Sequence, residues 1–182
     1  MRRISEYGIL FILLCVGTVV GQSRARLEEI ACRQFGADGT LRAVTLSLRD
    51  DDLAALKSAN GRGHAWDKVS VYAIEKHART EGVMMVDNVK GKSRPITYAV
   101  IFDRHGGIAA LEILTYRESH GGEVRSEAFR RQFEGKRPGD AIAVGRDIRN
   151  ISGATISSRS VTNGARALVT LHRFLKEKGL LP

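Results

Sequence analysis

Hydrophobic residues between positions 69 and 116 form a series of short apolar stretches separated by polar turns. Four stretches rich in β-branched and other apolar residues follow one another, at 69–74, 82–89, 96–102 and 108–116. Stretches of this length and composition are typical of strands. Because the connection DRHGG between the last two is short and rich in glycine, like a hairpin loop, we expect consecutive strands to pair antiparallel.

Elsewhere the apolar residues recur at the spacing of a helix face. Near the C-terminus five positions are separated by four, three, four and three residues: Val161, Ala165, Leu168, His172 and Leu175. This is the stripe of an amphipathic helix. Shorter helices are predicted at 27–35, after the aspartates at 50–52, and from Ser126 through Phe129 and Phe133 to Gly135. Residues 41–48 alternate loosely and are predicted as a further strand.

The order of these elements predicts an α+β fold, with a mostly antiparallel sheet flanked by helices. A chain of 182 residues with 43% hydrophobic residues is long enough for one domain with its own core. We divide it into an N-terminal helical and strand portion at 26–80 and a second portion at 81–178.

Residues 1–25 have the composition of a secretory signal. Two arginines precede an apolar stretch of 14 residues, and small residues close the segment. A helix of that length spans about 21 Å, which is short of a hydrocarbon core of about 30 Å. The sequence therefore predicts export to the periplasm or the outer face of the cytoplasmic membrane, with the segment either a cleaved signal peptide or a retained membrane anchor.

Charge and cysteine content exclude several classes of function. The net charge is +9, but the basic residues are dispersed among acidic ones, so no nucleic-acid partner is predicted. After residue 25 only Cys32 remains, which rules out an intramolecular disulfide and a Cys-x-x-Cys-His haem attachment. The five histidines lack the spacing of a zinc site, and no metal site is predicted.

The most informative stretch is DIRNISGATISS at 147–158, directly before the predicted C-terminal helix. Ser152, Gly153 and Ala154 have little side-chain bulk, so a large or anionic group can approach the backbone. The first amides of a helix lack partners, and the helix dipole favours a negative charge there. A phosphate fits this position, whereas a simple helix cap requires only one hydroxyl.

The residues in and before this stretch resemble a known family. SGAT within DIRNISGATISS, the segment DRHGGIAALEILTYRESHGGEVR and the following FRRQFEGK are similar to the FMN-binding domain family, over roughly residues 82–175. Members include flavin subunits of sodium-pumping NADH:quinone oxidoreductases and Rnf-type complexes. Many have an aspartate six residues before the last threonine of the motif, where this chain has Arg149, with Asp147 two positions earlier.

The resemblance implies a cofactor and the residue that carries it, and the neighbouring residues are further candidates for contacting that cofactor. The last threonine of the motif, here Thr155, is expected to carry FMN through a phosphoester bond, installed by a magnesium-dependent flavin transferase that uses FAD. The residues expected to contact the cofactor are Thr155, Ser152, Gly153, Ala154, Ser157 and Ser158, with Glu118, Ser119 and Gly121 as further candidates for lining the flavin ring.

The sequence therefore predicts an exported electron-transfer flavoprotein. It is expected to be an electron carrier or a component of a redox complex rather than a stand-alone catalyst, with a membrane or periplasmic redox partner. The alternative is a non-enzymatic sensory or accessory module that binds a flavin or a partner non-covalently.

Overall fold

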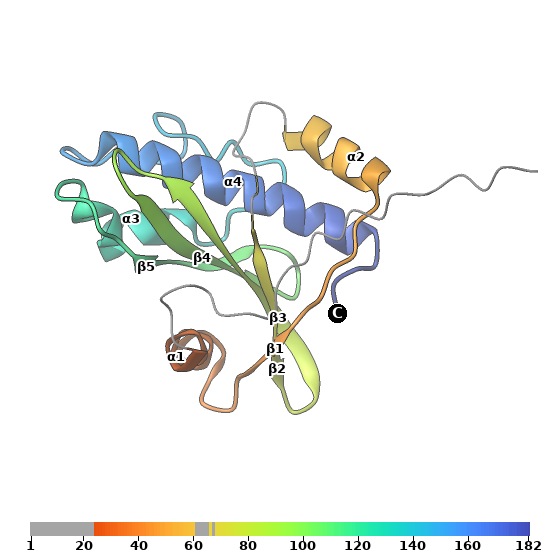
Figure 1. The fold of residues 1–182 in the computed structure, drawn as a ribbon. Coiled ribbons are helices and arrows are strands. Elements are labelled where there is room, and N and C mark those ends of the chain that lie inside the picture. The colour runs from red at the N-terminus through yellow and green to blue at the C-terminus, as the bar shows by residue number, and fades with distance from the viewer. Residues whose placement is uncertain (1–23, 61–65, 67) are drawn as a thin grey trace, which may run out of the picture.

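A five-stranded antiparallel sheet forms the centre of the protein (Figure 1). The computed structural model describes residues 24–60, 66 and 68–182. The strands are β1 (Thr40–Ala43), β2 (Ser70–Lys76), β3 (Arg79–Lys90), β4 (Pro95–Asp103) and β5 (Ile108–Thr115). Each pairs antiparallel with its neighbour along the chain, in the order β1-β2-β3-β4-β5. The predicted α+β fold is confirmed.

Helices cover the two faces of the sheet. They are α1 (Arg24–Phe35), α2 (Asp50–Asn60), the short α3 (Glu127–Arg130) and α4 (Thr155–Glu177), with 3₁₀ turns η1 (Gly122–Arg125) and η2 (Arg131–Phe133). The long helix α4 lies along one face, and α1 lies on the other (Figure 1). All five positions of the predicted C-terminal stripe are buried. The helix begins six residues before the first of them.

The core consists of two layers, because alternate residues of the central strands point to opposite faces. In β3, Val83, Met85 and Val89 belong to the layer under α4, whereas Met84 and Val86 belong to the layer under α1. The central strands therefore have apolar residues on both sides. This explains why their sequence reads as continuous apolar stretches instead of a strict alternation.

Helix α4 lies very close to the sheet at Gly164. A Cβ atom at this position would lie 2.5 Å from Val89 Cγ1 and 2.9 Å from Tyr98 Cζ, and even closer to the Tyr98 hydroxyl. Since carbon atoms do not approach so closely, only glycine permits this spacing between helix and strands. The buried Tyr98 hydroxyl donates a hydrogen bond to Asp87 Oδ2 (3.3 Å), and burial, followed by the neighbouring Asp87, raises the pKa of Tyr98.

The opposite end of α4 carries a buried histidine. The ring of His172 stacks on Phe102, with 4.2 Å between ring centroids, and 3% of the residue is exposed. Burial and, to a smaller extent, the charge of Lys176 lower the pKa of His172, Asp103 acts in the opposite direction, and the net pKa is about 4. His172 is therefore neutral at pH 7 and belongs to the core.

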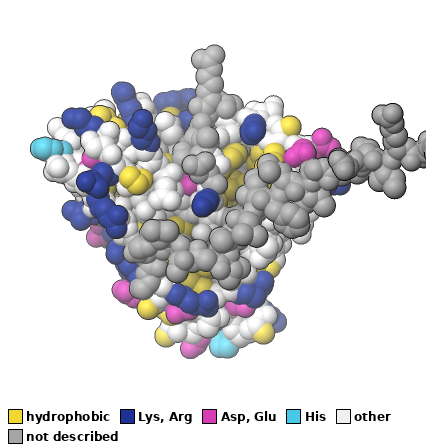
Figure 2. Space-filling model, viewed as in Figure 1, with side chains coloured by type: hydrophobic (Ala, Val, Ile, Leu, Met, Phe, Trp, Pro, Cys, Tyr) yellow, Lys and Arg dark blue, Asp and Glu magenta, His cyan; other side chains and the backbone are white. Residues whose placement is uncertain are grey.

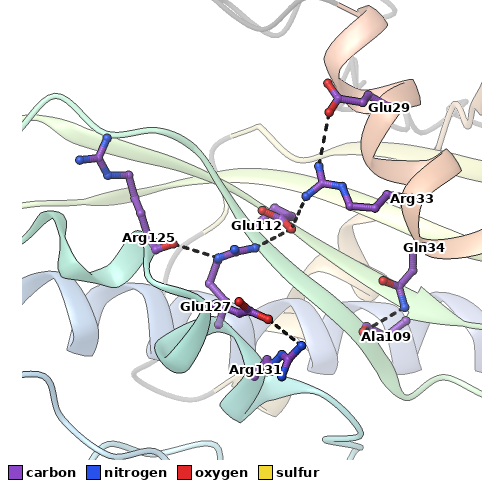
Figure 3. Close-up of polar contacts among 9 residues, drawn as sticks. Glu29, Arg33, Gln34, Ala109, Glu112, Arg125, Glu127 and Arg131 are labelled. Atoms are coloured by element: carbon purple, nitrogen blue, oxygen red, sulfur yellow. Dashed lines mark hydrogen bonds and ion pairs between the residues drawn. The ribbon is translucent and has the colours of Figure 1, made fainter.

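On the α1 face, Glu112 of β5 connects two helices through ion pairs (Figure 3). Its Oε1 atom lies 3.6 Å from Arg33 Nη1 of α1 and 2.6 Å from Arg130 Nη1 of α3. The Gln34 side chain adds a hydrogen bond to the Ala109 carbonyl of the same strand (3.3 Å). Because α1 makes these contacts, the N-terminal part of the described chain is packed onto the strands that lead to α4.

Two predicted elements differ from the structure. The strand predicted at 41–48 ends at Ala43, because the chain crosses from the α1 layer, which contains Leu41, to the α4 layer, which contains Leu46. The helix predicted from Ser126 to Gly135 is one α-helical turn continued by the 3₁₀ turn η2. Its cap is confirmed, since Ser126 Oγ accepts a hydrogen bond from the Phe129 amide (3.3 Å).

The predicted signal or anchor falls almost entirely on residues 1–23, which lie outside the described residues. The structure describes the chain from Arg24, where α1 begins. Among the described helices, none has the length and apolar character needed to cross a membrane.

Candidate functional site

Thr155 is the first residue of α4 and is exposed to solvent. No described side chain caps this end of the helix: the residue at the cap position is Ala154, which has no side-chain acceptor. The first helical hydrogen bond runs from the Ser158 amide to the Ala154 carbonyl (2.8 Å). The amides before Ser158 therefore point out of the helix end, together with the positive end of its dipole.

The residues before Thr155 leave space around its hydroxyl group. Ser152 and Gly153 are exposed, and Ala154 is buried. Gly153 has φ 81°, a conformation that favours glycine, and a Cβ atom there would meet nothing nearer than Glu123 Oε1 at 3.8 Å. The glycine is thus needed for the turn into the helix, and the adjacent surface is open to an incoming group.

A residue that sequence reasoning missed positions the Thr155 hydroxyl. Asn150 Nδ2 donates a hydrogen bond to Thr155 Oγ1 (3.1 Å), and both side chains are exposed. This bond occupies a lone pair of the oxygen and leaves its proton free to point elsewhere. A polar side chain five residues before a helix gives no sequence signal of its own, because the conformation of the intervening turn decides whether that side chain contacts the first residue of the helix.

Asp147, two positions before Arg149, is held by contacts within the loop that precedes the site. The carboxylate of Asp147 pairs with Lys136 Nζ (2.9 Å) and accepts the amides of Ile142 (3.1 Å) and Ala143 (2.9 Å). Burial raises the pKa of Asp147, but these hydrogen bonds and the ion pair outweigh it and lower the pKa to about 2. Its charge therefore stabilises the loop before the site.

The two serines that follow Thr155 are buried. Ser157 Oγ lies 2.9 Å from the hydroxyl oxygen of Tyr116, which also makes a short hydrogen bond to the His120 carbonyl. Because a carbonyl can only accept, Tyr116 donates to His120, and Ser157 must donate to Tyr116. Ser158 is fully buried, and its Oγ has no partner among the described residues.

Gly121 fits closely between the turn that follows β5 and the start of α4. Its φ is 85°, and a Cβ atom would lie 2.6 Å from the Tyr116 hydroxyl, 3.0 Å from Ser157 Oγ and 3.5 Å from Ala154 Cα. Any larger residue would push the turn away from α4. Gly121 therefore holds the turn beside the site, and Tyr116, which sequence reasoning also missed, connects the two.

Glu118 connects the same turn to the loop between β3 and β4. Its Oε1 atom accepts the backbone amides of Ser93 (2.6 Å) and Arg94 (2.9 Å), and these bonds lower the pKa of Glu118. The neighbouring Ser119 is exposed. Three segments distant in sequence thus meet at one end of the molecule: the β3–β4 loop, the turn after β5 and the start of α4 (Figure 1).

Ile156, next to Thr155, is unusual for its exposure. Its exposed fraction is 51%, and it is the only large hydrophobic residue among those described that is exposed. Sequence reasoning missed it because an apolar residue in a helical segment normally faces the core. A single exposed apolar side chain is common on protein surfaces, so Ile156 by itself does not mark a binding surface.

Comparison with known proteins agrees with this arrangement. Residues 91–170, from the β3–β4 loop to the body of α4, match the family described as FMN-binding domain. The resemblance predicted from the sequence is confirmed, because this segment of the chain is similar to the FMN-binding domain family.

The chain is also similar to a curated relative from Clostridium ljungdahlii, which is a subunit of the proton-translocating ferredoxin:NAD(+) oxidoreductase complex. The two are 29% identical over 133 residues, which cover 69% of this chain and 68% of the relative.

Proposed function

We propose that this protein is a flavin-binding electron-transfer component that carries FMN on Thr155 through a phosphoester bond and works outside the cytoplasm. The family match supports FMN as the cofactor, and the similar oxidoreductase component supports a role in electron transfer beside membrane redox partners. The isoalloxazine ring of FMN supplies the redox chemistry, while the protein holds and positions it.

The observation that best supports a covalent attachment is the accessibility of the Thr155 hydroxyl. Its side chain is exposed at an uncapped helix start, inside the matched residues, and its oxygen is bonded by Asn150 alone among the described residues. A buried or capping hydroxyl would be unavailable to a second enzyme. The small residues Ser152 and Gly153 leave the approach open, and the unpaired first amides of α4 suit a phosphate.

Attachment requires a flavin transferase and FAD. The Thr155 oxygen forms a bond to the phosphorus next to the riboflavin part of FAD, and the pyrophosphate bond breaks. AMP leaves with the electron pair of that bond, and the threonine proton passes to a base of the transferase. We expect Asn150 to orient the Thr155 oxygen, because its hydrogen bond occupies one lone pair of that oxygen and leaves the other lone pair free to attack.

Flavin attachment can be tested on the full chain produced together with an FAD-dependent flavin transferase. We expect fluorescence that survives heating in SDS and an intact mass increased by one FMN group. Thr155→Ala should abolish both, whereas Thr170→Ala, on the same helix but bonded to the Arg166 carbonyl, should keep both. Fluorescence retained by Thr155→Ala would place the attachment elsewhere, and flavin lost on denaturation would favour the non-covalent module.

Export can be tested separately. A fusion of the full chain to alkaline phosphatase, which folds only outside the cytoplasm, should be active. Deletion of residues 2–22 should abolish that activity without changing the amount of fusion protein. An inactive full-length fusion would contradict an extracytoplasmic location.

A further inference from the structure

Exposed cations surround the end of the molecule that carries Thr155. They come from the β3–β4 loop, from the turns after β5 and from the second turn of α4. We refer to them as the basic rim: Lys92, Arg94, Arg117, Arg125 and Arg159. Figure 2 shows Lys and Arg side chains gathered on the side of the molecule where these segments lie in Figure 1.

Contacts described above place these cations around one site. The amides of Ser93 and Arg94 bind Glu118, which brings the β3–β4 loop to Arg117. The guanidinium of Arg125 lies 5.7 Å from the ring centroid of Tyr116, whose hydroxyl reaches the start of α4. Arg159 follows Thr155 by four residues, so both lie on the same face of the helix.

The charge of the basic rim is only partly offset by nearby carboxylates. None of its five cations forms an ion pair with a described residue, which is also true of the exposed Arg26 and Lys57 on other faces. The nearby carboxylates are Glu118, which accepts two backbone amides and interacts with the charge of Lys92, and the exposed Glu123, so five cations face two anions and the rim stays positive. A cluster of unpaired cations creates a potential that attracts an anionic partner and accelerates its association.

An apolar side chain lies within this rim. Ile156 adjoins Thr155 and precedes Arg159 by three residues, so it is close to both on the helix surface. An apolar centre surrounded by charged residues is the usual anatomy of a protein docking surface. A helix that binds a lipid surface instead presents a broad apolar face of several residues, and Ile156 alone is exposed here among the described large hydrophobic residues.

We propose that the basic rim and Ile156 form the docking surface for an acidic one-electron redox protein that exchanges electrons with the flavin at Thr155. This rests on the proposed function, since the flavin supplies or receives the electrons. In each direction one centre is oxidised as the other is reduced: an electron that leaves the flavin reduces the haem or iron–sulfur centre of the partner. Docking at this surface brings the two centres together, and electron transfer slows steeply with distance.

Stopped-flow kinetics can test the proposal: the flavin-loaded full chain is reduced with a stoichiometric amount of dithionite and mixed with oxidised cytochrome b5 as an acidic probe or with oxidised cytochrome c as a basic one. The rate with cytochrome b5 should fall by about tenfold or more between about 20 mM and 500 mM salt, because salt screens the attraction. The rate with cytochrome c should rise over the same range. A rate with cytochrome b5 that does not depend on salt would overturn the proposal.

Charge reversal locates the surface. Arg94→Glu combined with Arg117→Glu should lower the low-salt rate with cytochrome b5 by about tenfold. The matched control, Arg26→Glu with Lys57→Glu, makes the same charge change on exposed residues of α1 and α2 and should lower the rate much less. Equal loss in both variants would mean that only net charge matters and would refute a specific surface.

Further measurements separate the docking proposal from the proposed function. Flavin fluorescence and the rate with an uncharged quinone should be the same in the rim variant and the control, which shows an intact flavin site. If the chain carries no covalent flavin, the proposed function fails, and calorimetric titration of cytochrome b5 still tests docking. Loss of cytochrome b5 binding in the rim variant, with binding retained by the control variant, would support the docking proposal. A rim variant that loses binding to phosphatidylserine vesicles but not to cytochrome b5 would refute it in favour of a membrane.

Discussion

The hydrogen bonds of Tyr116 connect the turn after β5 to the helix that carries Thr155, and their removal should have a measurable cost. Tyr116→Phe deletes one hydroxyl that accepts from Ser157 and donates to His120. The His120 carbonyl belongs to an exposed residue and can bond water, whereas Ser157 is only 5% exposed and loses its partner. A buried hydroxyl without a partner costs about 1–3 kcal/mol, so we expect a loss of about 1–2 kcal/mol.

Urea unfolding of the full chain measures this loss. With a slope of about 2 kcal/mol/M, the midpoint should fall by roughly 0.5–1 M without a change of slope. Ser157→Ala removes the same bond from the other side and should cost about 0.5–1.5 kcal/mol, because Tyr116 keeps its bond to His120.

The double variant decides whether the two residues act as a pair. Tyr116→Phe with Ser157→Ala should cost about 1 kcal/mol less than the sum of the single variants, since each removes the same hydrogen bond. Additive effects, equal within about 0.3–0.5 kcal/mol, would show that the bond contributes nothing in solution and would refute the assignment of Ser157 as donor to Tyr116.

Three further predictions concern the core and a helix cap. Gly164→Ala should destabilise the protein by about 1–2 kcal/mol in urea, although alanine favours helices, because the methyl group overlaps Tyr98; equal or greater stability would contradict the close packing. Because burial holds the pKa of folded His172 at about 4, below the unfolded value, the contribution of neutral His172 to the unfolding free energy should be fully present above pH 6.5 and should fall toward pH 4, by at most about 3 kcal/mol. His172→Phe should not show this loss between pH 6.5 and 4.5. A loss of the same size in this variant would mean that other groups cause it. Ser126→Ala should cost about 1 kcal/mol of unfolding free energy, while Ser126→Asp, which keeps an acceptor, should cost less.

Four of the strands and the C-terminal helix could be predicted because their signals are local. The four apolar stretches became β2 to β5, and the small residues before Thr155 do precede a helix. The turn between β2 and β3 carried no such signal: His77 and Ala78 have φ 48° and 60° without being glycines. The pairing of the two strands imposes this conformation, and no residue type in the turn announces it.

The contacts of the candidate site could not be predicted, because they join residues far apart in sequence. Ser157 lies 41 residues after Tyr116, and Glu118 lies 25 residues after Ser93. Whether these side chains meet depends on the register of β4 and β5 and on how α4 crosses the sheet. Ser157 and Ser158 were predicted to donate hydrogen bonds to the phosphate of the cofactor, but only the structure shows that both are buried.

The order of the strands has a consequence for anyone who trims the gene. The residues matched to the FMN-binding domain begin at Gly91, yet β4 pairs along nine positions with β3, from Gly82 opposite Asp103 to Lys90 opposite Pro95. In a fragment that started at residue 91, β4 would become an edge strand. Its backbone amides and carbonyls on the β3 side would lose their partners, and the side chains of Val100 and Phe102, which are buried in the full chain, would lie beside this edge. Such a fragment is expected to aggregate, so a minimal soluble version has to retain the upstream hairpin and the helix that shields its far side.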